Sequence, residues 1–303
     1  MKRFNKINEH EQGVAFAILS SLLWGFLPIY WKSLEPIDPL LILFYRILLA
    51  SGFALILALI FYRREDILKP LKDKGTLLTL LAAGAVISVN WGTYIWAVSN
   101  GRILETSIGY YIDPLIVCIF GILFFKEKLN KYKLAAILSA FAGVAVMLIY
   151  HHRIPLVALM LAFTWASYAA IKKKLQMEAV LSLLWETILM SPLALIVILY
   201  FELTGRGAAA HGTPAQWILL ALAGLMTGTP LMLFAMGANR INLITIGILG
   251  YISPSITLLL GIFVYHEPFD KIQLLTFAII WAGLVVFTLG EVKESRAVSD
   301  ERV

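Results

Sequence analysis

Apolar residues occur in blocks of about 20 along the whole chain, and short polar or charged segments separate the blocks. A helix rises about 1.5 Å per residue, so a block of that length can cross the roughly 30 Å hydrocarbon core of a bilayer. The pattern predicts an all-α membrane protein with ten transmembrane helices. The segments between blocks are too short to form a soluble ATPase, kinase or receptor domain. The expected spans are residues 13–31, 39–62, 76–97, 104–125, 132–150, 154–171, 180–201, 215–237, 243–265 and 271–290.

Composition agrees with this reading, and the placement of charge gives an orientation. The chain of 303 residues is 60% hydrophobic and 15% charged, whereas a soluble domain has about a quarter charged residues. Its net charge is +6. Of the 25 Lys and Arg residues, 19 lie on the side of the amino terminus, 5 lie on the other side, and Arg46 lies inside a span. This bias is the positive-inside pattern. It predicts a bacterial cytoplasmic (inner) membrane protein with both termini inside, and the basic charge does not indicate a nucleic-acid partner.

Few residues suggest catalytic chemistry. The single cysteine, Cys118, lies within the fourth span, so no intramolecular disulfide is expected. The five histidines lack metal-ligand spacing, and no phosphate-binding loop or nucleophile-elbow motif occurs. We therefore expect no catalytic residues, no metal, no cofactor and no enzymatic activity. We also expect the first span to be retained rather than cleaved, because it shows no clear small-residue exit site.

The two halves of the chain are similar at an offset of 140 residues. YIDPLIVCIFGILFFKEKLNK (Tyr111–Lys131) aligns with YISPSITLLLGIFVYHEPFDK (Tyr251–Lys271). Glycine, proline and glutamate matches at this offset are informative, since leucine matches are common in an apolar chain. The expected organisation is a tail at 1–12, five-helix repeats at 13–150 and 152–290, and a second tail at 291–303.

Five is an odd number of spans, so the second repeat must cross the membrane in the opposite sense to the first. The charges agree: KEKLNK in the first half carries three lysines, and its partner HEPFDK carries one. Inverted repeats recur in secondary transporters, whose sites lie near the midplane between the halves. This arrangement favours transport by alternating access.

The stretch SIGYYIDPL (Ser107–Leu115) places Asp113 and Pro114 near the centre of the fourth span. An acid at that depth usually faces a polar interior, and a proline removes a backbone donor. We expect the helix to kink or open at Pro114, and likewise at Pro230 and Pro254. A packing kink without function is the alternative.

Arg46 and Glu186 occupy equivalent positions in the two repeats, inside the second and seventh spans. Isolated charges there are costly, so each should be paired or hydrated. Inversion separates them by on the order of 10 Å in depth, so Glu105 or Asp113 is the expected partner of Arg46. Arg46, Glu105, Asp113 and Glu186 are thus candidate coupling or gating residues. A structural ion pair at Arg46, and a protonated, hydrogen-bonded acid at Glu186, remain the alternatives.

Polar and aromatic residues within the spans are candidates for lining a substrate cavity. Asn90 and Tyr94 share one helical face, as do Tyr110 and Asp113. Aromatic residues at span ends, such as Trp31, are better explained as interface anchors. The candidate lining residues are Trp24, Asn90, Trp91, Tyr94, Tyr110, Asp113, Trp165, Thr229, Tyr251 and Ser253.

Three stretches resemble EamA-type members of the drug/metabolite transporter superfamily, specifically the bacterial RarD group. They are LLWGFLPIYWK (Leu22–Lys32), NWGTYIWAVSNGRILETSIGYYIDPL (Asn90–Leu115) and TGTPLMLFAMGANRINLITIGILGYISPS (Thr227–Ser255). The resemblance extends over essentially the whole chain. It implies a ten-helix, two-repeat transporter with a central cavity lined mainly by the third, fourth, eighth and ninth helices. In that group Asn often stands at the position of Asp113, so the resemblance does not carry a proton role to this residue.

The sequence thus predicts a permease that moves a small organic solute across the membrane. Export is the expected direction, with protons or exchange as candidate means of coupling, and the bilayer is the other partner. An integral-membrane lipid-modifying enzyme and a channel-like pore are the alternatives. The enzyme would need a nucleophile or metal cluster near an interface, and the channel would favour one continuous polar stripe.

Overall fold

The computed structural model describes residues 9–100, 102–151, 156–266 and 271–300. In these ranges the regular structure is entirely helical, and ten segments are long and apolar enough to cross a membrane. The predicted ten-span, all-α architecture is confirmed. The elements are α1 (Glu9–Lys32), α2 (Pro39–Phe61), α3 (Arg64–Leu68), a 3₁₀ turn (Lys69–Lys72), α4 (Lys74–Ser99), α5 (Ile103–Phe125), α6 (Lys131–His151), α7 (Leu156–Leu175), α8 (Ala179–Leu203), α9 (Ala208–His211), α10 (Pro214–Ala221), α11 (Ala223–Ala238), α12 (Leu243–Gly250), α13 (Ile252–Phe263) and α14 (Lys271–Asp300).

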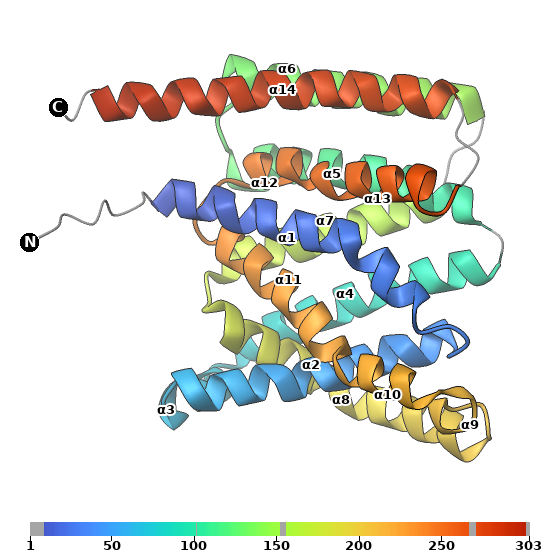
Figure 1. The fold of residues 1–303 in the computed structure, drawn as a ribbon. Coiled ribbons are helices and arrows are strands. Elements are labelled where there is room, and N and C mark those ends of the chain that lie inside the picture. Colours follow the sequence, from blue (N-terminus) through green and yellow to red (C-terminus); the bar gives the residue numbers. More distant parts are fainter. Residues whose placement is uncertain (1–8, 101, 152–155, 267–270, 301–303) are drawn as a thin grey trace, which may run out of the picture.

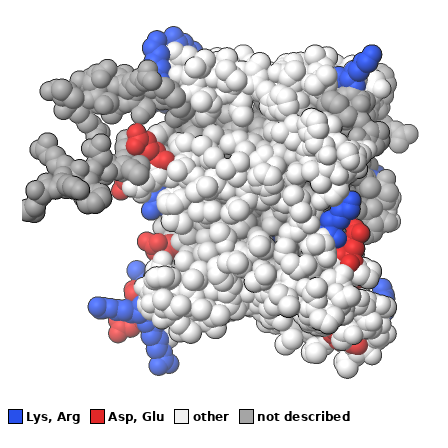
Figure 2. Space-filling view, in the orientation of Figure 1, with Lys and Arg blue, Asp and Glu red and all other residues white. Residues whose placement is uncertain are grey.

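The outer surface matches a bilayer environment. Many large apolar side chains are exposed along the helices, among them Phe61, Phe124 and Ile149. Figure 2 shows Lys, Arg, Asp and Glu gathered toward the two ends of the helices, with a broad band of other residues between them. An apolar belt of this kind is expected where acyl chains surround the protein. The chain is therefore a multi-pass membrane protein.

The helices form layers that interleave the two halves of the sequence. Helices α6 and α14 pack together at one edge and α2 and α8 at the other, while the remaining spans lie between them (Figure 1). Helix α5 packs on α7, and the corresponding α12 and α13 pack on α1. Likewise α4 packs on α7, and α11, the counterpart of α4, packs on α1, the counterpart of α7. Most interhelical contacts therefore join one half to the other.

Several contacts join residues that are 140 positions apart. The Tyr251 hydroxyl donates to the Tyr111 carbonyl at 2.9 Å, and the Ser191 hydroxyl donates to Ser51 Oγ at 3.1 Å. Both contacts lie where a span of one half meets its counterpart in the other.

Equivalent glycines permit close approach of helices. A Cβ on Gly84 would lie 2.7 Å from the Glu186 carbonyl oxygen on α8, and a Cβ on Gly224 would lie 2.3 Å from the Leu49 carbonyl oxygen on α2. Any larger side chain at either position would force α4 from α8 or α11 from α2.

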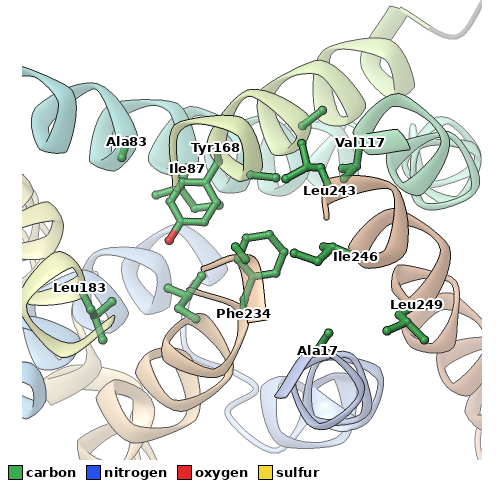
Figure 3. Close-up of a cluster of buried hydrophobic side chains, with 14 of the residues drawn as sticks. Ala17, Ala83, Ile87, Val117, Tyr168, Leu183, Phe234, Leu243, Ile246 and Leu249 are labelled. Carbon is green, nitrogen blue, oxygen red and sulfur yellow. The ribbon is translucent and has the colours of Figure 1, made fainter. Parts of the chain in front are cut away.

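The core lies where spans of both halves meet. Tyr168 of α7 and Phe234 of α11 stack at 6.1 Å between ring centroids, and Ile87 of α4 and Val117 of α5, from the first half, belong to the same cluster (Figure 3). The core therefore stabilises the two halves as one unit rather than each half separately.

Two of the three prolines expected to break helices do not interrupt them. Helix α5 continues through Pro114, and α11 continues through Pro230. A proline removes one helical hydrogen bond, and transmembrane helices tolerate this where neighbouring groups pack closely. The helices therefore do not open at these two prolines, and a kink there stays a prediction.

The eighth and ninth spans are instead divided at Leu222 and Tyr251, where ψ is −7° and −13°. Pro254 is the third residue of α13. Backbone N–H groups in the first turn of a helix have no intrahelical partner, so proline is tolerated there. The division of the ninth span thus lies three residues before Pro254.

Candidate functional site

Arg46 lies in the second turn of α2, where its side chain is 8% exposed. Its Nε donates to Thr227 Oγ1 on α11 at 3.1 Å. The guanidinium carbon lies 4.2 Å from the centroid of the Trp31 ring and 4.4 Å from that of Trp91. Cation–π contacts of this kind are strengthened by burial. Helices α1, α2, α4 and α11 together hold the guanidinium.

Of the two acids expected to pair with Arg46, Asp113 does not do so. Among the described side chains no carboxylate contacts Arg46, and Asp113 is not its partner. Glu105 lies in α5, but its side chain is outside the described residues. Arg46 Nη2 is buried and has no hydrogen-bond acceptor. The structure thus shows a fixed, buried cation with an unsatisfied donor.

A tyrosine pair lies next to this cation. Tyr94 of α4 and Tyr110 of α5 have ring centroids 5.9 Å apart and share a hydrogen bond, and both interact electrostatically with Arg46. Both residues belong to inner spans, yet they are 37% and 39% exposed. The exposed part of Tyr110 is therefore its ring, because its hydroxyl is buried next to Tyr94.

Asp113 lies one helical turn beyond Tyr110 on α5 and is half-buried. Its Oδ1 is buried without a hydrogen-bond partner. Such a carboxyl oxygen is costly to leave unsatisfied in a dry interior. Asp113 and Tyr110 lie on the same face of α5, as their spacing predicts. Tyr94 and Arg46 both interact with Tyr110.

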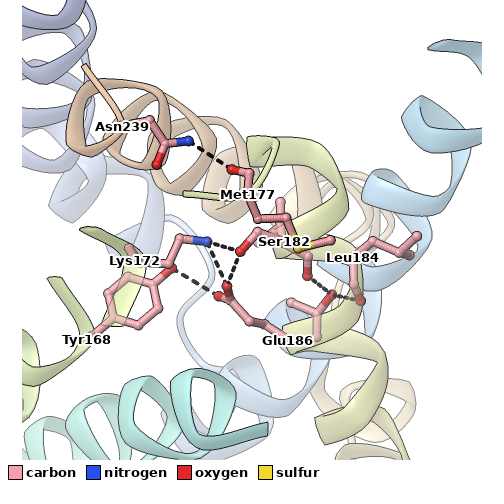
Figure 4. A network of polar contacts seen from close by, with 9 residues as sticks. Tyr168, Lys172, Met177, Ser182, Leu184, Glu186 and Asn239 are labelled. Atoms are coloured by element: carbon pink, nitrogen blue, oxygen red, sulfur yellow. Dashed lines mark hydrogen bonds and ion pairs between the residues drawn. The ribbon is translucent and has the colours of Figure 1, made fainter. Parts of the chain in front are cut away.

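A second polar cluster lies between α7 and α8, and we call it the Lys172–Glu186 network (Figure 4). Lys172 Nζ lies 2.6 Å from Glu186 Oε1, and the two side chains are 3% and 2% exposed. The Ser182 hydroxyl donates to Oε1 at 2.6 Å, and the Tyr168 hydroxyl donates to Oε2 at 3.1 Å. Both carboxyl oxygens of Glu186 therefore have partners.

This network revises two expectations. Glu186 is held in an ion pair, rather than as an acid satisfied by neutral groups alone. Lys172 follows the expected end of the sixth span at residue 171, but it belongs to the last turn of α7 and points inward. The flanking Lys173 and Lys174 concealed it, since a run of three lysines ordinarily marks a solvated face.

An aromatic column leads away from the Lys172–Glu186 network. Tyr168 lies 5.8 Å from Trp165, and Trp165 lies 6.2 Å from Trp24, measured between ring centroids. Phe234 packs against both Trp165 and Tyr168. Trp24 Nε1 is buried without an acceptor. Trp24 and Trp165, two of the candidate lining residues, are thus in contact, whereas the pattern of polar residues gave no signal for Phe234.

The other candidate lining residues have different surroundings. Asn90 donates to the Leu161 carbonyl and to Thr164 Oγ1 on α7, both at 2.8 Å, so its amide joins two helices. Tyr251 is buried and bonds to α5. Thr229 and Ser253 are half-buried on α11 and α13.

Three residues at the Arg46 cluster were missed or misassigned from sequence. Trp31 was interpreted as an interface anchor because it ends a span, yet its ring covers the guanidinium. Thr227, which accepts from Nε, and Tyr30, which interacts electrostatically with Arg46, were not singled out. A buried arginine needs nearby acceptors and rings, and that requirement could have prompted a search of the neighbouring spans.

No cluster of His, Cys, Asp and Glu suited to a metal ion occurs in the portion of the chain that the structure describes. What the polar residues form is a pair of buried charged centres, one on α2 and one on α7 and α8. Such centres can bind charged groups or change partners during a conformational change.

Comparison with known proteins agrees with the membrane architecture. The EamA-like transporter family model matches residues 11–149 and 153–289. The chain is 45% identical over 294 residues to the "Uncharacterized transporter YojE" of Bacillus subtilis (strain 168), covering 95% of this chain and 97% of that protein. It is 33% identical over 289 residues to "Protein RarD" of Escherichia coli (strain K12), covering 95% and 97%. A crystal structure of a protein with 17% sequence identity superposes with a TM-score of 0.72, covering 91% of this chain and 97% of that one, and shows the same fold. With both of its halves matched, the chain belongs to the EamA-like transporter family.

Proposed function

We propose that this protein is a secondary transporter that moves a small organic solute across the bacterial cytoplasmic membrane by alternating access. Several relatives are named as transporters and the matching family is described as an EamA-like transporter family, which supports the general class. The mechanism, the exported solute and coupling to protons or to exchange are parts of the proposal. In it, residues 13–150 and 152–290 form two inverted five-helix repeats.

The observation that carries the proposal is the reciprocal packing of the two halves. The most extensive contacts between a span of one half and a span of the other have counterparts at the 140-residue offset, including α5–α7 with α12/α13–α1. Tyr111 meets Tyr251, and Ser51 meets Ser191. Two such halves can rock between arrangements of similar energy, and this is the basis of alternating access in inverted-repeat carriers.

The positions of the loops support inversion and cytoplasmic termini. The start of α1 and the end of α14 lie at the same end of the bundle as α3, whereas α9 lies at the opposite end (Figure 1). The segment containing α3 carries five Lys and Arg residues between Arg63 and Lys74, and the segment from Thr204 to Thr213 carries Arg206 alone. The positive-inside rule assigns the basic end to the cytoplasm.

The two charged centres suggest how the states could differ. In the proposed orientation Arg46 lies in the outer half of the membrane and Glu186 in the inner half, because α2 enters from outside and α8 from inside. The aromatic column of Trp24, Trp165 and Tyr168 leads toward the inner centre. A solute leaving the cytoplasm would pass the Lys172–Glu186 network before it reached Arg46. Asp113, in the middle of α5, is the candidate site for a coupled proton.

Counterflow in proteoliposomes tests this function. Purified protein would be reconstituted with each unlabelled solute of a panel of amino acids, nucleosides and organic acids inside, and the labelled solute would be added outside at trace concentration. A carrier gives a transient accumulation that saturates with internal solute, and a pH gradient changes its rate if protons are coupled. A channel gives equilibration without overshoot. Absence of flux for the whole panel would contradict the proposal.

A further inference from the structure

We propose that Arg46 binds the anionic group, a carboxylate or a phosphate, of the solute that this protein transports. The inference rests on the proposed transport function and adds to it a chemical class of substrate. It assigns a role to the Arg46 centre that neither the repeat architecture nor the family relationship requires.

The first argument is the missing counter-charge. Arg46 is 8% exposed, and among the described side chains no acid contacts it. Glu186, the acid at the equivalent position of the other half, is already paired with Lys172. Charge within a membrane protein is costly, and buried ions are ordinarily paired. A buried arginine without an acidic partner is explained if the ligand supplies the negative charge.

The second argument is the fixed geometry of the guanidinium. The Trp31 and Trp91 rings lie 4.2 and 4.4 Å from its central carbon, and Thr227 occupies Nε. These contacts hold the planar group while leaving Nη2 without an acceptor. A guanidinium donates to carboxylates and phosphates through such a fork of N–H groups. The unused donor is therefore the group that an anion would engage.

The third argument is the kind of residue beside Arg46. Tyr94 and Tyr110 interact with Arg46 and share a hydrogen bond, and as whole residues they are 37% and 39% exposed. The hydroxyl that does not donate within the pair can donate to an anion, and the two rings can pack on an apolar body. These residues therefore suit an organic anion with a hydrophobic or aromatic portion, rather than a small inorganic ion.

Binding can be measured on purified full-length protein in detergent. The probes are phenylacetate and phenyl phosphate, with neutral phenylacetamide as the matched compound for phenylacetate. The readout is the thermal unfolding midpoint as a function of probe concentration, because a ligand that binds the folded state stabilises it. We expect saturable stabilisation by at least one of the two anions and none by phenylacetamide.

The variants R46Q and R46K test the residue. R46Q should raise the apparent Kd of the anion by about 10- to 100-fold, the range for loss of a hydrogen bond to a charged group. R46K keeps the charge without the fork and should fall between R46Q and the native protein. R240Q is the matched control: Arg240 also lies over an aromatic ring, that of Phe16, but it is exposed. R240Q should bind like the native protein.

Several outcomes would overturn the inference. They are equal stabilisation by phenylacetamide and phenylacetate, no stabilisation by any probe, or unchanged anion binding in R46Q. If R46Q fails to fold, R46K and the comparison of acid with amide in the native protein still decide the question. Stronger stabilisation by short-chain phosphatidylglycerol than by either soluble anion would assign a lipid headgroup to Arg46 and overturn the solute assignment.

Failure of this inference is distinguishable from failure of the transport proposal. If anion binding depends on Arg46 but no solute shows counterflow, the anion site is supported and the transport proposal is contradicted. If neutral solutes show saturable counterflow and R46Q leaves it unchanged, the transport proposal is supported and the anion site is contradicted.

Discussion

At the residue scale, the Lys172–Glu186 pair shows how a charge can be kept within an apolar helical bundle. The two charges meet at 2.6 Å, and Ser182 and Tyr168 occupy the remaining acceptor sites of the carboxylate. A buried pair contributes little relative to apolar residues of similar size, but removing one partner leaves an uncompensated charge. Replacing one member of the pair should therefore lower the free energy of unfolding more than replacing both members.

A double-mutant comparison tests this view. K172M and E186L should each lower the free energy of unfolding by about 3 kcal/mol, because each leaves a buried charge alone. The combined variant K172M/E186L should recover most of that loss. Y168F, which removes one hydroxyl donor, is the milder control. Thermal unfolding midpoints of the purified variants provide the measurement, and additive losses in the double variant would contradict the pairing argument.

Asp113 differs from Glu186, because its Oδ1 has no hydrogen-bond partner to lose. D113N keeps the shape of the side chain and removes its titratable proton. We expect normal abundance and an unchanged unfolding midpoint, with altered transport and a weakened dependence of flux on pH. Reconstituted flux measured across a pH series checks this. If D113N transports at the rate of the native protein at every pH, Asp113 has no role in coupling.

The sequence predicted the charged positions of the candidate site better than their partners. Arg46, Glu186 and Asp113 stand out because a charge inside an apolar block is rare and costly. Their partners do not stand out, because pairing is decided by helix rotation and by the crossing of distant spans. Lys172 was hidden at the end of a basic run, and Thr227 lies 181 positions from Arg46 along the chain.

At the element scale, the start of α12 is fixed by a residue from the other half of the chain. Glu127, in the loop after α5, accepts hydrogen bonds from the backbone N–H groups of Leu243 and Ile244 at 2.7 and 2.9 Å. The first N–H groups of a helix have no internal acceptor, and a carboxylate there also meets the positive end of the helix dipole. This contact joins the α5–α6 loop to the ninth span.

E127A should therefore lower stability by about 1–3 kcal/mol, the range for loss of charge-assisted hydrogen bonds at a helix start. E127Q keeps an acceptor and should lose less. K128A, at the exposed next residue, is the matched control and should leave the unfolding midpoint unchanged. An E127A midpoint equal to that of K128A would show that the cap contributes nothing.

Asp73, before the start of α4, gives a pH-dependent contribution outside the membrane. The Thr76 hydroxyl and the backbone N–H groups of Thr76 and Gly75 donate to its carboxylate, and these bonds lower the pKa of Asp73 below its ordinary value of 3.8. A depressed pKa means that the stabilisation is complete above the ordinary value and declines as pH falls through the lowered one. The midpoint difference between native protein and D73A should be constant from pH 8 to about 5 and shrink below about 4. A difference that grows with acidification would contradict this sign.

The number and order of spans were predictable, whereas their internal divisions were not. Length and hydropathy decide whether a segment crosses the bilayer, and both are local properties of sequence. The divisions at Leu222 and Tyr251 have no local signal, since neither residue breaks helices by itself. Pro114 and Pro230, which carry such a signal, lie inside continuous helices because their neighbours pack tightly around them.

At the scale of the whole molecule, the loops that follow the fourth and ninth spans share an unusual backbone conformation. Lys126 and His266 are 140 residues apart and have φ of 52° and 51°, in the left-handed region that few residues other than glycine adopt. Their agreement extends the similarity of the halves from sequence to backbone geometry. In the proposed inverted arrangement these two equivalent residues lie on opposite faces of the membrane.

Labelling of K126C and H266C tests the inversion. Each would be made in a C118A background, since Cys118 is the chain's single cysteine. Lys126 and His266 are both exposed, and a membrane-impermeant maleimide would be applied to intact cells before and after permeabilisation. We expect H266C to react from outside and K126C only after permeabilisation. The C118A protein alone should remain unlabelled. Because the two positions share one local conformation, a difference in reactivity reports the side of the membrane rather than the fold of the loop. Reaction of both from the same side would mean that the halves run parallel, and rocking of inverted repeats would then have no structural basis.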